Sequence, residues 1–350
     1  MAGNRFFGIT SRLLMAIVAG LLVLSYLSVV INPAKVWPIS LSGIFFVPLS
    51  IANLVLLLWA LKRRSRSFII PLLAFLPALL FLGRYVRFSS EEVAEASCPL
   101  KIVSYNVGRF ALGEATDCEA RIMDFIRESD ADIVCLQEFY VNDVNALKEN
   151  IRRHLKGYRA DYYMFPTSRG AFGNVTLSRR PVVGKGKIKF EESSNLAIYT
   201  DYEVAGRRFR VYNCHFESYN ISFAGLVRAA FRADGDVFTD TGNKMKRSIM
   251  RRPRQVEQVF ADIERCPVEA FVCGDFNDNP MSYTYYRLLR GRKDAFVEAG
   301  KGFGATFALL WPMLRIDYVL FPERYRAVSH EIPRVEFSDH YPVVAQVDLL

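Results

Sequence analysis

Three long stretches without a charged residue, all near the N-terminus, constrain this chain most. Residues 13–31, 36–61 and 67–83 contain no Asp, Glu, Lys or Arg. A membrane-spanning helix needs about 17–25 mostly apolar residues, so the first two stretches are long enough and the third is just long enough. The sequence predicts transmembrane helices at about 13–31, 38–61 and 67–86, within a membrane region of residues 1–88.

The third stretch has an alternative interpretation. It contains Pro71 and Pro77 and is short for a span, so a re-entrant or interfacial segment remains open. A cleaved signal peptide fits poorly, because three apolar stretches follow one another and no small-residue cleavage site is evident.

Most of the formal net charge of +9 flanks the apolar stretches. Residues 1–97 hold 9 basic and 3 acidic side chains, whereas the rest of the chain holds 36 basic and 33 acidic ones. A nonspecific DNA-binding domain is expected to be strongly basic. The nearly balanced C-terminal part therefore does not favour nucleic acid as a partner.

The same charges predict a topology. Four basic residues lie in 62–66, between the second and third stretches, but only Lys35 lies between the first two. The positive-inside rule then places the N-terminus and residues 62–66 in the cytoplasm. We expect an integral, multi-pass protein of a bacterial inner membrane, with everything after about residue 88 on the extracytoplasmic side. Arg84 and Arg87 oppose this, and the domain is cytoplasmic if the third stretch does not insert.

Residues 89–97 form a short polar linker, and residues 98–350 form a second domain in which strands and helices mix irregularly. Many strands follow one another as hairpin-like pairs, which favours an α+β layered sandwich over a doubly wound parallel sheet. The six cysteines include no CxxC pair, so a zinc site is not expected. Cys135, Cys214 and Cys273 lie in apolar runs and are predicted to be buried thiols.

One strand of this domain ends in polar residues. The apolar run from Phe271 stops at Gly274-Asp275-Phe276-Asn277, and Asn279-Pro280 then turns the chain. Asp275 and Asn277 are two residues apart, so both side chains can face the same way. Turn chemistry alone also explains these residue types, but several other strand ends carry the same kind of residue: Asn106, Glu138, Asn213, His215, Asp317, Asp339 and His340.

Carboxylate and amide oxygens of this kind suit a hard cation, Mg²⁺ or Mn²⁺, which can neutralise a phosphoryl oxygen. An Asp–His pair can act as a general base on water, and a second His can bind phosphoryl oxygens. For each residue alone a structural role is also open, such as an ion pair between Asp317 and Arg315. His154 and His330 are expected at the surface.

Seven short motifs follow one another in order along the domain: Ser104-Tyr105-Asn106, Leu136-Gln137-Glu138, Gly173-Asn174 through Ser178-Arg179, Asn213-Cys214-His215, Gly274 to Asn277, Arg315 to Tyr318, and Ser338-Asp339-His340. This ordered set resembles that of the endonuclease/exonuclease/phosphatase superfamily over about residues 98–350. The resemblance implies a DNase I-like fold, a four-layered α/β sandwich.

The resemblance also implies roles for single residues. Glu138 would be the main metal ligand, with Asn106 and Asp339 beside it; His340 would be the base, oriented by Asp317; Asp275 and Asn277 would position the nucleophile and the phosphate; His215, Asn174 and Asn213 would lie on the phosphate side. Apurinic endonucleases carry an acidic residue where this chain has Gly108, which argues against the DNA-repair branch.

These expectations combine into a membrane-anchored, Mg²⁺-dependent phosphodiesterase or phosphomonoesterase, with Mn²⁺ as the alternative metal. A lipid headgroup is slightly favoured as substrate, because anchoring would hold the domain at a bilayer. Residues 221–232 have two open interpretations, an interfacial helix that dips into the bilayer and a surface helix packed on the domain. A nuclease acting on DNA or RNA is the first alternative. A catalytically silent, membrane-tethered binding module is the second.

Overall fold

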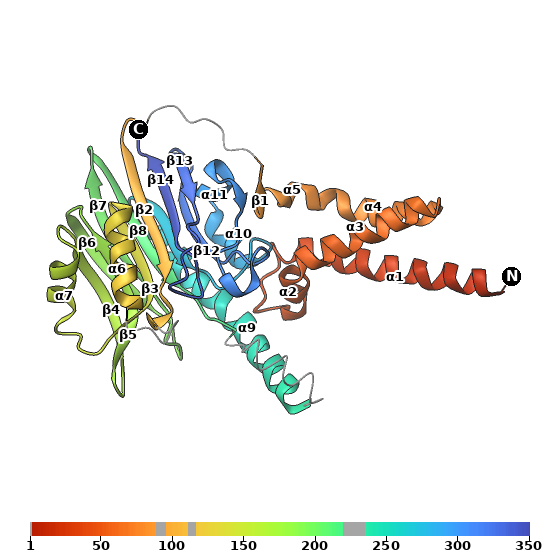
Figure 1. Cartoon of the computed structure of the whole chain (residues 1–350), viewed down its shortest axis with the longest axis horizontal. Coiled ribbons are helices and arrows are strands. Elements are labelled where there is room, and N and C mark those ends of the chain that lie inside the picture. Colours follow the sequence, from red (N-terminus) through yellow and green to blue (C-terminus); the bar gives the residue numbers. More distant parts are fainter. Residues whose placement is uncertain (1, 89–95, 111–116, 220–234) are drawn as a thin grey trace. The chain divides into compact units, whose positions relative to one another are not determined.

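The computed structural model describes residues 2–88, 96–110, 117–219 and 235–350. The chain divides into two compact units (Figure 1). The helical unit comprises Met1–Tyr85, Tyr219–Pro253 and Asp278–Tyr286; the sheet unit comprises Val86–Ser218, Arg254–Asn277 and Arg287–Leu350. The helical unit thus takes two segments that the sequence assigned to the 98–350 domain. The candidate interfacial helix at 221–232 lies outside the described residues.

The N-terminal part of the helical unit consists of apolar helices that pack on one another (Figure 1). Among the described residues, one helix is long and apolar enough to cross a membrane, through Ile9–Leu27, and a bent pair would make a second span. The elements are α1 (Ala2–Leu27), α2 (Trp37–Ile44), α3 (Phe46–Lys62), η1 (Arg66–Phe68), α4 (Ile69–Phe75), η2 (Leu76–Ala78) and α5 (Leu79–Leu82).

The second predicted span is not one continuous helix. α2 and α3 meet at a 63° bend. In a continuous helix the carbonyl of Ile44 would accept from residue 48, which is Pro48 and has no N–H. The third predicted span, 67–86, is a run of short helices that ends at Leu82 and contains Pro71 and Pro77. Membrane insertion of these helices stays a prediction.

The sheet unit contains two six-stranded sheets, which confirms the α+β sandwich. The first has the order β13 (Arg326–Glu331), β14 (Val343–Asp348), β2 (Pro99–Asn106), β3 (Ile133–Val141), β5 (Gly170–Ser178), β4 (Arg159–Thr167). The second has the order β10 (Arg292–Asp294), β12 (Asp317–Pro322), β9 (Glu269–Asp275), β8 (Arg207–His215), β7 (Leu196–Val204), β6 (Val182–Lys189). A small pair joins β1 (Val86–Arg87) to β11 (Gly302–Phe303).

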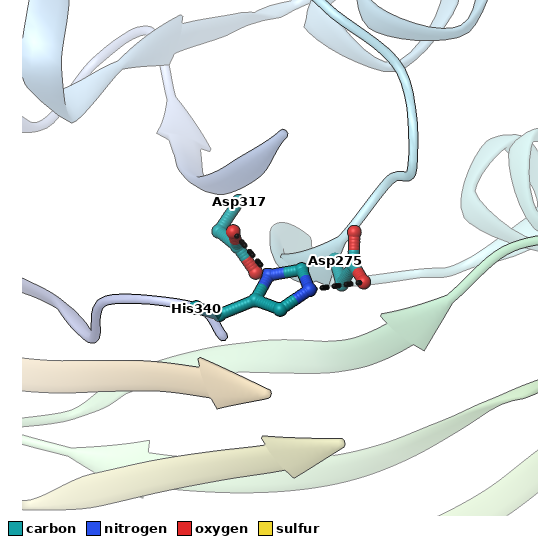
Figure 2. Close-up of side chains that lie close together, drawn as sticks. All are labelled: Asp275, Asp317 and His340. Atoms are coloured by element: carbon teal, nitrogen blue, oxygen red, sulfur yellow. Dashed lines mark hydrogen bonds and ion pairs between the residues drawn. The ribbon is translucent and has the colours of Figure 1, made fainter. Parts of the chain in front are cut away.

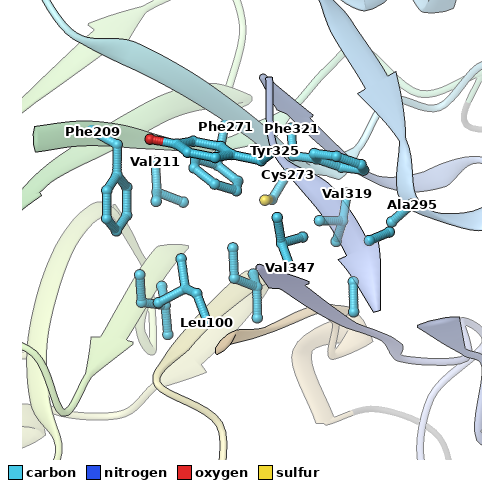
Figure 3. Packing of buried hydrophobic residues seen from close by; sticks show 14 of the residues in the cluster. Leu100, Phe209, Val211, Phe271, Cys273, Ala295, Val319, Phe321, Tyr325 and Val347 are labelled. Atoms are coloured by element: carbon cyan, nitrogen blue, oxygen red, sulfur yellow. The ribbon is translucent and has the colours of Figure 1, made fainter. Parts of the chain in front are cut away.

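The core between the two sheets is built from alternate residues of their strands (Figure 3). Leu100 and Val347 of the first sheet and Phe271 and Cys273 of the second belong to one fully buried cluster. Successive strand residues face opposite sides of a sheet, so the neighbours of these residues face outward. Cys135, Cys214 and Cys273 are buried, as predicted.

Helices cover the outer face of the first sheet. In α6 (Cys118–Ser129), Ile122 and Ile126 are four residues apart and pack with outward-facing residues such as Val134. α7 (Leu147–His154) adds Leu147 to the same cluster. The remaining helical elements are η3 (Gly108–Phe110), α9 (Gly235–Arg265), α10 (Tyr283–Leu289), α11 (Ala295–Ala299) and η4 (Ala308–Leu310).

Strand pairing brings the predicted strand ends together. β2 and β3 are parallel, as are β8 and β9, so their carboxyl ends meet at one end of the sandwich. His215 pairs with Asp275, and Asp275 pairs with Asp317 on the antiparallel strand β12. These three residues therefore form one row across the inner face of the second sheet.

Candidate active site

The backbone around Asp275 has a conformation that the sequence Gly-Asp-Phe-Asn permits. Gly274 has φ of 135°, and a Cβ there would lie 1.9 Å from the carbonyl oxygen of Cys214. Asn277 has φ of 51°, in the left-handed region that Asn tolerates better than most residues. The residues on both sides of Asp275 thus have a positive φ that depends on residue type.

Asp275 is buried and accepts hydrogen bonds from Asn106 and Asn277. Asn106 Nδ2 donates to Asp275 Oδ2 at 2.9 Å. The backbone N–H of Asn277 donates to Oδ1 at 2.8 Å, and Asn277 Nδ2 donates to Oδ2 at 3.1 Å. Burial raises the pKa of Asp275 to about 6, although His340 acts to lower it. The predicted residues Asn106, Asp275 and Asn277 are therefore in direct contact.

Asp317 and His340 form a buried pair beside Asp275 (Figure 2). His340 Nδ1 lies 2.9 Å from Asp317 Oδ2, and His340 Nε2 lies 3.8 Å from Asp275 Oδ2. Burial alone would lower the pKa of His340, but the charges of Asp317 and Asp275 raise it to about 10. This arrangement orients one imidazole nitrogen with a carboxylate and leaves the other facing the centre of the site. Arg315 instead pairs with Asp294, so the alternative Asp317–Arg315 ion pair is not formed.

Glu138 reaches the site through a β-bulge. Its φ is 51°, and the pairing of β3 with β5 shifts register between Leu136 and Phe139. Simple alternation would turn the side chains of Gln137 and Glu138 to opposite faces. At the bulge, Glu138 Oε1 lies 3.6 Å from His215 Nε2 although Gln137 is buried on the inner face. Bulges commonly re-aim a side chain next to an active site in this way.

His215 Nε2 is buried and has no hydrogen-bond partner within the described residues. It lies 3.6 Å from Glu138 Oε1 and 3.7 Å from Asp275 Oδ2. A buried nitrogen without a partner is unusual, and such a group is commonly completed by a ligand, an ion or water. The predicted role of His215 in binding phosphate stays a prediction.

The two other residues predicted on the phosphate side tie the sheets together. Asn213 Nδ2 donates to the carbonyl oxygens of Leu136 (3.2 Å) and Val175 (3.0 Å), and Asn213 has no exposed surface. Asn174 Nδ2 donates to the carbonyl oxygens of Leu196 and Asn213. Both amides satisfy main-chain oxygens between facing strands. The predicted phosphate-side role of Asn174 and Asn213 stays a prediction.

Asp339 lies at the mouth of the site. It is exposed, and a Cβ on Gly108 would lie 3.0 Å from Asp339 Oδ1. The neighbouring Ser338 Oγ donates to the carbonyl oxygen of Asn106 at 2.7 Å. An acidic side chain at position 108 would bring a second carboxylate beside Asp339, and the two like charges would repel each other. Glycine at position 108 avoids this repulsion.

Several contributing residues were not among those the sequence suggested. Thr306 Oγ1 accepts the backbone N–H groups of Ile316 (3.0 Å) and Asp317 (3.1 Å), which fixes the start of β12. Arg109 Nε lies 3.3 Å from Glu138 Oε2. Gln137 Nε2 donates to Asn213 Oδ1 at 2.8 Å. Gln137 belongs to the Leu136-Gln137-Glu138 motif but was not given a role, and no sequence signal pointed to Thr306.

The donor set fits a divalent cation. Ligand atoms of Asp275, Asp317 and His340 all lie within 4.8 Å of one another, but the Asp317–His340 hydrogen bond already engages two of them. Glu138 is partly exposed and borders the unpartnered His215 Nε2. Oxygen donors from Glu138 and Asn106, with Asp275 behind them, are the kind that Mg²⁺ and Mn²⁺ bind. These residues would hold such a cation on the Glu138 side of the site.

Two family profiles match the chain. Residues 103–340 match the endonuclease/exonuclease/phosphatase family, and residues 4–85 match a domain of unknown function (DUF8431). No curated protein matches the chain.

Solved structures share the fold of the sheet unit. An endonuclease/exonuclease/phosphatase from Bacteroides vulgatus has a TM-score of 0.54 at 18% identity, covering 73% of this chain and 100% of that one. The human Nocturnin catalytic domain with bound sulfate has 0.53 at 19%, covering 73% and 95%. TDP2 from D. rerio, complexed with a single strand DNA product, has 0.51 at 16%, covering 71% and 98%. The family match over most of the chain and the converged strand ends identify a phosphate-ester hydrolase that belongs to the endonuclease/exonuclease/phosphatase family.

Proposed function

We propose that the protein is a membrane-anchored, Mg²⁺-dependent phosphoesterase that hydrolyses a phosphodiester or phosphomonoester by direct attack of water. The observation that carries the proposal is the buried cluster of Asp317, His340 and Asp275 (Figure 2). The cluster lies at the end of the sandwich where the carboxyl ends of β8 and β9 meet. Asp317 orients His340 through Nδ1, so that Nε2 faces the position where water would be activated.

The charges of the site determine whether His340 is protonated. With a pKa of about 10, His340 carries a proton at neutral pH, whereas a general base must be free to accept one. A divalent cation on the Glu138 side would neutralise a phosphoryl oxygen and lower the pKa of His340 by charge repulsion. Asp275 and Asn277 then hold the water, and His215 Nε2 binds a phosphoryl oxygen.

A lipid headgroup is the leading substrate class. Its support is the apolar helical unit, whose first helix is long enough to anchor the chain in a bilayer. We place the sheet unit on the extracytoplasmic side of a bacterial inner membrane, on the distribution of basic residues alone. A tethered hydrolase stays at the bilayer surface, where headgroups are concentrated.

One observation favours a nuclease as the second candidate. Tyr163 pairs with Asn174, and Phe165 pairs with Phe172, so these rings face the inside of the first sheet at its edge. Lys187 and Lys189 of the facing edge strand lie 4.3 and 4.6 Å from the Tyr163 ring centroid. Partly exposed rings combined with cations are how single-stranded nucleic acids are bound. TDP2 from D. rerio was crystallised with a single strand DNA product.

The deciding experiment offers both substrates to the full-length chain in Mg²⁺. Headgroup release from phospholipid vesicles, without cleavage of a single-stranded oligonucleotide, supports the lipid proposal. Oligonucleotide cleavage that falls at least tenfold in a Tyr163→Ala, Lys187→Ala double variant establishes the nuclease instead. If neither substrate is cleaved by a folded protein that binds Mg²⁺, the silent binding module is the better interpretation.

A further inference from the structure

The segment that follows the Asp275–Asn277 motif belongs to the helical unit. The second segment of the sheet unit ends at Asn277, and the helical unit resumes at Asp278, with no residue between them. Asp278 to Tyr286 packs within the unit that contains α1 to α5. Met281 and Tyr285 in this segment have no exposed surface. The helices predicted to serve as an anchor therefore also hold nine residues next to the motif.

Asn279 caps the break between α2 and α3. Its Nδ2 donates to the carbonyl oxygens of Gly43 (3.0 Å) and Ile44 (3.3 Å). Its Oδ1 accepts the backbone N–H of Met281 at 2.8 Å. Because Pro48 has no N–H to offer Ile44, the helix break exposes an acceptor that Asn279 satisfies. The fit is specific, since the side chain uses both its donor and its acceptor groups.

Close packing surrounds this capping interaction. Ser28 Oγ, just beyond α1, lies 2.7 Å from the carbonyl oxygen of Met281. A Cβ on Gly43 would lie 2.3 Å from Ser28 Oγ and 2.4 Å from Met281 O. Only glycine fits at position 43 without displacing the segment. The contact is therefore sensitive to a single methyl group on the helical side.

Two further contacts hold the ends of the segment. Asp278 Oδ2 lies 3.1 Å from Nη1 of the buried Arg252. At the other end, the Arg84 guanidinium lies 5.1 Å from the Tyr286 ring centroid. The segment is thus fixed at its start, its middle and its end by residues of the helical unit.

We propose that the helical unit is the docking platform for residues 278–286 and that Asn279 is a positioning residue for hydrolysis. The inference rests on the proposed function. Asn277 is held in the left-handed region by what surrounds it, and Asp275 accepts two of its hydrogen bonds from Asn277. Fixing the chain immediately after Asn277 keeps both residues in place. The domain matching 4–85 is then required for activity as well as for location.

The test compares two buried asparagines of the helical unit in the full-length protein. Asn279→Ala removes the cap on Gly43 and Ile44. Asn53→Ala, the matched control, removes a bond of the same kind, from Asn53 Nδ2 to the carbonyl oxygen of Pro71 at 2.7 Å. Both variants lose stability, so activity is measured at the same number of degrees below each melting temperature. Gly43→Ala disrupts the packing of α2 on residues 278–286 without changing those residues. Ser28→Ala, which removes the hydrogen bond to Met281, is a milder variant if Asn279→Ala does not fold.

We expect Asn279→Ala and Gly43→Ala to lower kcat for bis(4-nitrophenyl) phosphate at least tenfold, with KM changed less than threefold. Asn53→Ala should keep kcat within twofold. Amide hydrogen exchange at residues 277–282 should become at least tenfold faster in Asn279→Ala but not in Asn53→Ala.

Unchanged exchange in Asn279→Ala would overturn the docking proposal. Faster exchange with an unchanged kcat would overturn the positioning role. If the parent protein hydrolyses nothing, the proposed function has failed, and the exchange result alone decides whether the helical unit is the dock.

Discussion

The helical unit and the sheet unit differ in the side chains that they expose. In the sheet unit, apolar residues such as Phe271 are buried and polar strand ends converge on Asp275. In the helical unit, Leu73 and Leu80 are 62% and 77% exposed, whereas Asn53 is fully buried. A large exposed apolar surface is uncommon in a water-soluble domain and marks contact with a partner or a membrane.

One buried asparagine from each unit shows that the interiors of the two units are alike. Asn213 in the sheet unit and Asn53 in the helical unit both donate to main-chain carbonyl oxygens from fully buried positions. The first joins two sheets around a catalytic centre, and the second joins α3 to α4 within apolar helices. Buried amides fix the packing in both units, so the outer surfaces, rather than the interiors, distinguish their surroundings.

The largest expected effect concerns the catalytic centre of the sheet unit. His340→Ala removes the group that Asp317 orients, and we expect kcat to fall by about 10²–10⁴-fold, as for loss of a general acid or base. The measurement is phosphodiester hydrolysis by full-length protein in Mg²⁺. His330→Asn is the matched control, because His330 is also buried in the sheet unit but packs edge-on to Phe296. Equal losses in both variants would show that His340 acts only on folding.

Glu138→Gln should weaken cation binding by more than about tenfold, because it removes the partly exposed carboxylate on the cation side of the site. Titration calorimetry with Mn²⁺ or Mg²⁺ measures this. Glu298→Gln is the control, since Glu298 pairs with Lys293 elsewhere in the sheet unit. Unaltered cation affinity in Glu138→Gln would indicate that the cation binds instead at the cluster of Asp275, Asp317 and His340.

An added charge on the outer surface should change membrane association when it lies in the helical unit but not when it lies in the sheet unit. Leu73→Glu places a carboxylate on an exposed position of α4, and we expect membrane insertion to become less favourable by about 2.5–3.5 kcal/mol. Val183→Glu makes the same kind of change at an exposed position of β6 and should leave membrane association unchanged. Membrane fractionation with detergent extraction is the measurement. If both variants stay in the membrane fraction equally, the prediction that only the helical unit contacts the membrane is wrong.

The smallest expected effect is the pH dependence that His330 gives to the sheet unit. Burial, reinforced by Arg315, lowers the pKa of His330 to about 3, from 6.5 in the unfolded chain. Between these values the unfolded state binds the proton and the folded state does not, so stability falls as the pH drops below 6.5. The loss from pH 6.5 to pH 5 is about 2 kcal/mol. Urea unfolding of the parent and of His330→Phe measures it; equal pH slopes would contradict the prediction.

The sequence predicted the elements that depend on local pattern. Asn106, His215 and Asp275 lie where apolar strands stop, Asp317 lies at the start of β12, and the pairing of strands brings the last three together. The buried His330 contradicts the expected surface position, because its strand β13 is covered by α11, a contact that no local pattern reveals.

Two other features needed the three-dimensional structure. The bulge at Glu138 depends on the pairing of β3 with β5, since the sequence alone implies regular alternation. Residues 278–286 join helices more than 200 positions earlier in the chain, a long-range contact that a contiguous domain division cannot express. The break at Phe45 was not predicted, although Pro48, which has no N–H for the carbonyl of Ile44, lies in the sequence of the predicted span.

The most direct measurement is hydrolysis of bis(4-nitrophenyl) phosphate by the purified full-length chain, with Mg²⁺ or with EDTA, beside Asp317→Asn. Metal-dependent release of nitrophenol by the parent, reduced at least a hundredfold in Asp317→Asn, is the predicted result. Equal rates in the parent and the variant, or equal rates with Mg²⁺ and with EDTA, would contradict a cation-assisted hydrolysis that depends on the Asp317–His340 pair.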